Sequence, residues 1–410
     1  MLKKLMSVTI IFIGVGLILI AVATPAEATP SSLSDIERLG KMLFLDKALS
    51  YNENQSCATC HGAEFGYTGP NGYINAHGAV YPGSIETLFG DRKPPSSAYA
   101  GESPILHYNA EDEVWVGGMF WDGRASGWIL GDPLAEQAKG PYLNPVEQAL
   151  PDAYTLCMKV YKSNYATLFR KVWDTLDCST PAAVEMVYDQ IGFSVSAYEK
   201  SYEVNPFSSK FDRFWDTAKS RGMDVTQINV TNWQEYLHLG LNSQEVYGLA
   251  IFNDEGKGKC ALCHTLDEGS AGYPLFTDFT YDNLGMPINP ENPIYMTNPD
   301  FIDLGLGKFL ESQGFAEEVY MAEYGKFKVP TLRNVDQREG KTIKAFGHNG
   351  TFKSLEEIVH FYNTRDVEFW PAPEYPDTVN FEELGDLGLT AAEEDFLVIF
   401  MQTLTDKTTP

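Results

Sequence analysis

The chain has little positive charge. Of its 410 residues, 30 are Lys or Arg and 56 are Asp or Glu, which gives a formal net charge of −26. This excess of negative charge argues against nucleic-acid binding, because the phosphates would be repelled. Beyond about residue 23 the chain also lacks any apolar run long enough to cross a membrane. We therefore expect no nucleic-acid partner and no membrane span after the N-terminal segment.

The N-terminal segment has the pattern of a secretory signal peptide. Lys3 and Lys4 precede an apolar run over 5–23, and the small-residue cleavage pattern Ala26-Glu27-Ala28 follows. We predict a signal peptide at residues 1–28 and a mature protein in the periplasm. Because the apolar run is long for a signal peptide, an uncleaved N-terminal anchor is the less favoured alternative.

Cysteine is scarce, and most of it lies in two short motifs. Four of the six cysteines form Cys57-Ala-Thr-Cys60-His61 and Cys260-Ala-Leu-Cys263-His264. The C-x-x-C-H spacing is the attachment signature of c-type haem, in which the thiols add to the porphyrin vinyl groups and the histidine binds the iron. One such motif could instead be a zinc half-site or a redox dithiol, but no further Cys-rich segment could complete a zinc site. We predict two covalently bound c-type haems.

The remaining cysteines, Cys157 and Cys178, lie in a predicted helical hairpin. An oxidising compartment allows them to form a structural disulfide, and two free thiols are the alternative. We expect no catalytic role for either residue.

A repeated pattern precedes both haem motifs. Gly40 stands four residues before Phe44, and Gly248 stands four residues before Phe252, each in a helical pattern. Glycine allows a second helix to approach closely, and phenylalanine fills the core. A capped apolar helix that starts near Thr390 suits packing against Gly248. The Pro- and Gly-rich stretches between the motifs show little strand periodicity, so we predict a mainly α fold with long ordered loops.

The ligand on the other side of each iron decides what that iron can do. His77 lies 16 residues after His61 in a Gly-rich loop that could fold back over the first haem. The alternative is an ordinary histidine in a surface loop.

For the second haem no methionine stands at an obvious position, and Tyr362 is the better candidate. Ser354 and Glu357 predict a capped helix that carries Tyr362 on its apolar face, with His360 on the opposite side. A tyrosine on such a face is often simply part of the core. Both readings remain open on periodicity alone.

Several ordered blocks of sequence, together with the haem motifs, resemble a known family. They are Phe120-Trp121-Asp122-Gly123-Arg124-Ala125, Glu136-Gln137-Ala138-Lys139-Gly140-Pro141 with Pro145-Val146-Glu147, Val329-Pro330-Thr331-Leu332-Arg333-Asn334, and His348-Asn349-Gly350 followed by the Tyr362 helix. Across essentially the whole mature sequence the chain resembles the bacterial di-haem cytochrome c peroxidases and their MauG-like relatives.

The resemblance implies two cytochrome c-like haem domains, residues 29–235 with the peroxidatic haem and residues 236–410 with the electron-transfer haem. His77 matches a histidine that ligates the first iron in the resting peroxidases and leaves on activation. Trp121 matches the relay between the haems. Gln137 and Glu147 match residues that flank the peroxide pocket, where a carboxylate can move a proton between the two peroxide oxygens.

Two residues depart from the peroxidase pattern. Tyr362 stands where the peroxidases have a methionine ligand, as it does in the MauG-like branch, and a phenolate should give this haem a much lower potential. Lys93 stands where the family has an asparagine that contacts a calcium ion. An ammonium group is a poor neighbour for a hard cation, so the substitution disfavours calcium.

These observations favour a periplasmic di-haem peroxidase that reduces hydrogen peroxide to water. Its electrons would come from a small redox protein, a cytochrome c or a cupredoxin, which the acidic charge can help to steer. One alternative is a MauG-like oxidase that modifies Trp or Tyr side chains of a partner protein. Another is a plain di-haem electron-transfer cytochrome. Dimers are common among the peroxidases that the chain resembles, so a homodimer is also compatible.

Overall fold

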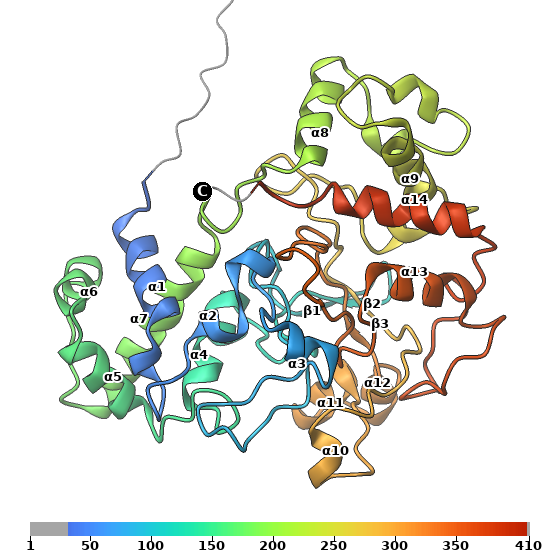
Figure 1. Ribbon diagram of the computed structural model, residues 1–410. Coiled ribbons are helices and arrows are strands. Elements are labelled where there is room, and N and C mark those ends of the chain that lie inside the picture. The colour runs from blue at the N-terminus through green and yellow to red at the C-terminus, as the bar shows by residue number, and fades with distance from the viewer. Residues whose placement is uncertain (1–31, 408–410) are drawn as a thin grey trace, which may run out of the picture. The chain divides into compact units, whose positions relative to one another are not determined.

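The described part of the protein is predominantly helical, as Figure 1 shows for the computed structural model. The description covers residues 32–407, so the predicted signal peptide at residues 1–28 lies outside it. The expected fold class, mainly α with long loops and little β, is confirmed. Within the described range, no helix has the length and apolarity that a membrane span requires.

The first half of the chain carries the helices up to α7. Their bounds are α1 (Asp35–Leu45), α2 (Cys57–Cys60), α3 (Gly72–Ala76), α4 (Pro133–Leu143), α5 (Ala153–Lys162), α6 (Ala166–Trp173) and α7 (Pro181–Glu199). The second half carries α8 (Lys210–Ser220), α9 (Ser243–Asn253), α10 (Ile294–Thr297), α11 (Gly305–Ser312), α12 (Glu317–Met321), α13 (Leu355–Thr364) and α14 (Ala391–Gln402). The second haem motif begins in a 3-10 turn over Cys260–Leu262.

The strands form two small antiparallel pairs. In the first pair, β1 (His107–Asn109) runs against β2 (Val114–Val116), with His107 opposite Val116. In the second pair, β3 (Tyr281–Asp282) runs against β4 (Phe327–Lys328), with Tyr281 opposite Lys328. Neither pair is long enough to build a core.

The long helices start at residues that cap their free backbone N–H groups. Ser34 with Glu37 forms a capping box at α1, Asn242 with Glu245 does so at α9, and Thr390 with Glu393 does so at α14. Thr180 caps α7, and Pro181 follows at its first position, where a missing N–H costs nothing. These local signals fix where the four helices that form the main crossings begin.

Two helix crossings repeat the same construction. Helix α1 packs on α7, and α9 packs on α14, as Figure 1 shows for each pair. A Cβ atom added to Gly40 would collide with the Ser194 carbonyl oxygen and lie 2.9 Å from Tyr198 Cβ. A Cβ atom added to Gly248 would collide with the Phe396 carbonyl oxygen. The absence of a side chain at each glycine is what allows the backbones to touch, which confirms the predicted packing against Gly248.

The buried apolar side chains gather in two large clusters. The first surrounds the α1–α7 crossing and includes Phe44 and Ile191, and the second surrounds the α9–α14 crossing and includes Phe252 and Phe400. A disulfide links Cys157 in α5 to Cys178 ahead of α7, so these two residues pair. Leu33–Pro410 form one compact unit, and the predicted division at residue 235 stays a prediction.

Candidate active site

The first haem motif and two residues of the resemblance line one cavity. The cavity has a volume of about 450 Å³, including space open to solvent, and its walls include Cys57, Cys60, His61, Gln137 and Glu147. The cysteines come from α2, and Gln137 comes from α4. The folded chain therefore brings together most of the residues predicted for the peroxide site, although they are separated by up to 90 positions in the sequence. We call this space the N-terminal cavity.

The two motif histidines have the same hydrogen-bonding arrangement. His61 Nδ1 lies 3.0 Å from the Tyr67 carbonyl oxygen, and His264 Nδ1 lies 2.9 Å from the Phe276 carbonyl oxygen. A carbonyl oxygen only accepts, so each Nδ1 carries the proton and each Nε2 keeps its lone pair. Burial lowers the pKa of both imidazoles to about 4. Neutral imidazoles held by Nδ1 are what an iron ligand requires, so both histidines fit a haem.

The four motif cysteines also fit haem attachment. All four are free thiols, half-buried in the walls of their cavities. Burial raises the pKa of each thiol, to about 12 for Cys60 and for Cys260. Without a metal, such groups stay protonated at neutral pH. Thioether bonds to a porphyrin would leave no charge to bury.

Glu147 has the environment of a group that transfers protons. It is half-buried in the loop after α4, and Asn144 Nδ2 donates a hydrogen bond of 2.8 Å to its Oε2. Burial raises the pKa of the Glu147 carboxyl, against an opposing effect of Arg124. A raised pKa makes the protonated form accessible nearer neutral pH, which suits a group that accepts a proton and returns it.

The second motif lines a much larger cavity, which we call the C-terminal cavity. It encloses about 1760 Å³, including space open to solvent, and its walls include Cys260, Cys263, His264 and Tyr362. Helix α13 begins at the predicted N-cap, Ser354, and carries Tyr362 into this cavity. Burial raises the pKa of the Tyr362 phenol well above its usual value. Without a metal the phenol is therefore neutral, and a bound iron would favour its ionisation.

Two methionines share the C-terminal cavity with Tyr362. Met286 and Met401 are both buried and both line it. Neither methionine is favoured by its place in the sequence, because Met286 follows a Gly in a loop and Met401 lies on an apolar helix. Three side chains that can ligate iron therefore line the same cavity, and ligation by Tyr362 stays a prediction.

Trp121 lies at the wall of the C-terminal cavity, and hydrogen bonds join it to one residue from each half of the chain. Its Nε1 donates to the Lys93 carbonyl oxygen at 2.8 Å, and its own carbonyl oxygen accepts from the Lys328 N–H at 2.9 Å. Besides burial, the Lys93 ammonium contributes to the lowered pKa of His61. Lys93 therefore lies near both His61 and Trp121. This position is compatible with a relay between two haems.

His77 lies apart from the N-terminal cavity. Its side chain is exposed, its Nδ1 lies 2.8 Å from the Tyr73 carbonyl oxygen, and its ring packs against Tyr73 with centroids 4.4 Å apart. The cavity wall does not include it. His77 could ligate the first iron only if its loop moved, so this role stays a prediction.

Lys93 occupies the position where the resemblance implied an asparagine near calcium. It is buried, and its Nζ donates to Thr68 Oγ1 at 3.0 Å and to the Pro94 carbonyl oxygen at 3.1 Å. Burial lowers its pKa to about 8. An ammonium group that already holds these oxygen atoms disfavours a second cation beside them.

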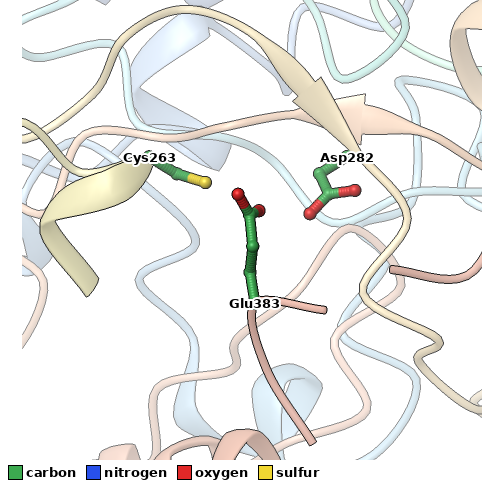
Figure 2. A group of neighbouring side chains, drawn as sticks. All are labelled: Cys263, Asp282 and Glu383. Atoms are coloured by element: carbon green, nitrogen blue, oxygen red, sulfur yellow. The ribbon is translucent and has the colours of Figure 1, made fainter. Parts of the chain in front are cut away.

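Figure 2 shows three potential metal-binding side chains at the wall of the C-terminal cavity. The Cys263 thiol and the carboxylates of Asp282 and Glu383 lie within 4.8 Å of one another. Asn380 Nδ2 donates to both carboxylates, at 2.8 Å and 2.7 Å. Since the haem motif uses Cys263, the cluster is better described as two acids at the edge of the haem site.

Sequence reasoning missed one residue of the N-terminal cavity. Glu199, the last residue of α7, lines it beside Cys57 and His61 and is only 3 % exposed. In the sequence it is one of 56 acidic residues, at the end of a helix that carries no motif. Glu199 could be found only by comparing α7, which packs on Gly40, with α14, which packs on Gly248, and these contacts are known only from the structure.

The fold and the two cavities define a class of protein: a helical oxidoreductase with two haem sites built on repeated helix crossings. Comparison with known proteins agrees. The model of the di-haem cytochrome c peroxidase family matches residues 34–220. The methylamine utilization protein MauG of Paracoccus denitrificans is 33% identical over 95% of this chain and 93% of its own. Cytochrome c551 peroxidase of Nitrosomonas europaea is 24% identical over 88% of this chain and 84% of its own.

A solved structure supports the same assignment. The diheme peroxidase BthA of Burkholderia thailandensis superposes with a TM-score of 0.74 and 29% identity, covering 92% of this chain and 87% of that one. The chain belongs to the di-haem cytochrome c peroxidase family, which includes MauG. It is therefore an enzyme of the oxidoreductase class, and membership implies two haem groups.

Proposed function

We propose that the protein is a periplasmic di-haem peroxidase that reduces hydrogen peroxide to water. The observation that carries the proposal is the N-terminal cavity, which His61, Gln137 and Glu147 line together. The reaction takes one peroxide, two electrons and two protons and gives two waters. When bound through Cys57 and Cys60, the first haem would supply the iron that accepts the peroxide.

The side chains around that position have separate tasks. The Glu147 carboxylate would accept a proton from one peroxide oxygen and return it to the other, so that the second oxygen leaves as water. Gln137 donates a hydrogen bond from its amide to the leaving oxygen. Asn144 holds Glu147 in place through its 2.8 Å hydrogen bond.

The electrons would enter through the second haem, attached to Cys260 and Cys263 with His264 and Tyr362 as iron ligands. Trp121 would relay them, because its indole lines the C-terminal cavity and bonds to Lys93 near His61. The donor would be a small cytochrome c or cupredoxin, which the charge of −26 can steer if its surface is basic. The relatives named as cytochrome c peroxidases support this donor class.

The periplasmic location is supported by the sequence of residues 1–28 and by the Cys157–Cys178 disulfide, which an oxidising compartment favours. We propose covalent attachment for both haems on the thiol environments described above. Calcium is not part of the proposal, because the Lys93 ammonium holds the neighbouring oxygen atoms. A homodimer remains compatible with the family.

The experiment compares peroxide turnover by the wild-type di-haem protein with that of Glu147→Gln, using reduced cytochrome c as donor. We expect turnover to fall about 10²–10⁴-fold, the usual contribution of a general acid–base group. Glu86→Gln, which changes an exposed acid in a loop, serves as the matched control and should keep wild-type turnover. Equal turnover in Glu147→Gln and wild type, with both haems present, would overturn the residue assignments.

A second function is favoured by Tyr362 and by the similarity to MauG. A tyrosine ligand would lower the potential of the second haem, so that both haems could share oxidising equivalents and remove electrons from Trp or Tyr side chains of a partner protein. The test incubates the protein with peroxide and a tryptophan-containing peptide but no donor. Peroxide-dependent oxidation of the peptide, detected by mass spectrometry, would favour the oxidase. Absence of both peptide oxidation and donor turnover would leave an electron-transfer cytochrome.

A further inference from the structure

The N-terminal cavity contains a second carboxyl group that the proposed mechanism does not use. Glu199 is 3 % exposed, and its Oε2 lies buried without a hydrogen-bond partner among the described residues. The side chain lines the cavity beside Cys57, where its charge adds to the raised pKa of that thiol. An unpaired buried carboxylate oxygen is costly, so its presence calls for a physical explanation.

The repeated helix crossings show that packing does not require an acid at this position. A Cβ at Gly40 would lie 2.9 Å from Tyr198 Cβ, and a Cβ at Gly248 would lie 2.8 Å from Phe400 Cβ. Tyr198 and Phe400 are therefore equivalent, and the next residues, Glu199 and Met401, are equivalent too. Both line a haem cavity. The C-terminal cavity uses an uncharged thioether where the N-terminal cavity uses a carboxyl group.

The surroundings of Glu199 favour its neutral form. It ends α7, where the partial negative charge of the helix terminus opposes a carboxylate. The nearest cation, Lys200, is already paired with Asp132 at 2.5 Å and is partly exposed. Burial raises the pKa of Glu199 to about 8, while the Ser97 hydroxyl group and the charge of Lys200 act in the opposite direction. The other titratable groups that face it are Cys57, Tyr67, Tyr142, Asp132 and Glu147.

We propose that Glu199 tunes the reduction potential of the N-terminal haem and couples its reduction to the uptake of one proton. This inference rests on the proposed placement of that haem. On reduction, the iron site gains one electron from the donor, and the Glu199 carboxylate gains one proton from solvent to become a carboxylic acid. On oxidation both leave. The net charge of the cavity stays constant, which lowers the electrostatic cost of changing the redox state beside a buried carboxyl group.

The direction of the pH effect follows from the charges. A carboxylate stabilises the oxidised, more positive iron site, so ionised Glu199 lowers the potential and protonated Glu199 raises it. Conversely, the oxidised iron site lowers the pKa of Glu199 relative to the reduced site. Between these two pKa values the potential must fall as pH rises. The limit is a tenfold change in the reduction equilibrium per pH unit, which is 59 mV for one electron.

The test is a spectroelectrochemical titration of the full-length di-haem protein from about pH 5 to about pH 9, a range that includes the raised pKa of Glu199 and starts just above the usual glutamate value. The signal of the N-terminal haem is identified as the one missing from the double variant Cys57→Ala, Cys60→Ala. We expect the wild-type potential to fall with pH. In Glu199→Gln, which keeps the size of the side chain, the potential should be higher at the alkaline end and the slope should be lost.

Glu185→Gln is the matched control, because it removes an exposed acid from the same helix and should leave the slope unchanged. Ser97→Ala is a second variant that keeps the carboxyl group. It removes the hydroxyl group that lowers the pKa of Glu199, so the sloping region should move to higher pH. The inference is overturned if Glu199→Gln keeps the wild-type slope, or if Ser97→Ala leaves the sloping region in place. A protein with fewer than two haems would instead contradict the proposed function.

Discussion

The two haem cavities are built on the same helix crossing and lined by different chemistry. In both, a glycine lets two helices touch, a C-x-x-C-H motif lies nearby, and the motif histidine is held by a backbone carbonyl. The N-terminal cavity is small and carries Gln137, Glu147 and Glu199. The comparison indicates that the shared scaffold positions an iron, and that the lining residues decide what the iron does.

The C-terminal cavity is larger and has a different lining. Its volume of about 1760 Å³ is lined by aromatic and thioether side chains, among them Trp121, Tyr362 and Met401. Acids line this cavity as well: Asp282 and Glu383 both accept a hydrogen bond from Asn380. The two cavities therefore differ in their candidate iron ligands, because a phenol and thioethers line only the second.

The largest difference between the two cavities is expected when the cysteines of one haem motif are replaced at a time. Cys57→Ala with Cys60→Ala should leave one covalent haem and abolish peroxide turnover, because the site of peroxide binding is lost. Cys260→Ala with Cys263→Ala should also leave one haem, but the first iron should still bind an added small ligand such as cyanide. Haem staining on a denaturing gel and mass spectrometry count the attached groups.

The control for these variants is the double variant Cys157→Ala, Cys178→Ala, which removes the disulfide and should keep both haems. If either motif variant retained two covalent haems, the attachment sites would be wrong. If the variant without the first motif still consumed peroxide, the assignment of peroxide chemistry to the N-terminal cavity would fail.

The sequence predicted the features that depend on local patterns. The haem motifs, the capping box at Thr390, the N-cap at Ser354 and the packing against Gly248 can be found from spacing, because each involves residues close together or a repeated pattern. The roles of Gln137 and Glu147 came from resemblance alone, since a carboxylate in a loop has no periodic signal.

The residues that could not be predicted reach their site through long-range packing. Glu199 enters the N-terminal cavity because α7 crosses α1, a contact between segments about 155 positions apart. Met286 approaches Tyr362 because a loop folds over the C-terminal cavity. His77 shows the converse problem: its spacing from His61 predicts a ligand, but spacing cannot say whether the loop faces the iron or solvent.

The side chain that ligates the second iron can be identified with two substitutions in the C-terminal cavity. If Tyr362 is the ligand, Tyr362→Met should raise the potential of this haem by on the order of several hundred mV, within the roughly 0.8 V that axial ligands span. Met286→Leu should then leave the potential nearly unchanged. Potentiometric titration followed by optical spectra measures both. A large shift in Met286→Leu together with no shift in Tyr362→Met would assign the ligand to Met286.

The shared helix crossing predicts that the two glycines have similar importance for stability. Gly40→Ala and Gly248→Ala would each drive a methyl group into a backbone carbonyl of the partner helix, so each should destabilise the protein by about 1–3 kcal/mol or more. Urea unfolding, followed by fluorescence and by the haem absorbance, gives the midpoints. Gly90→Ala is the control, because its nearest neighbour would be 3.9 Å away. A wild-type midpoint in either crossing variant would show that the crossing can relax.

The smallest effect is expected at His77, the one predicted ligand that lies outside both cavities. In the structure its ring packs on Tyr73 and faces solvent, so His77→Ala should change peroxide turnover of the activated enzyme by less than about threefold, as for a surface residue.

If the loop that carries His77 closes over the first iron in the resting oxidised protein, His77→Ala should lose a six-coordinate low-spin signal from the EPR spectrum. His107→Ala removes another exposed histidine with Nδ1 held by a backbone carbonyl, at 2.8 Å from Ile105, and should leave that spectrum unchanged. If His77→Ala and wild type had the same spectrum, His77 would not be a ligand of the N-terminal iron. The difference between the two haems would then lie entirely in the residues that line their cavities.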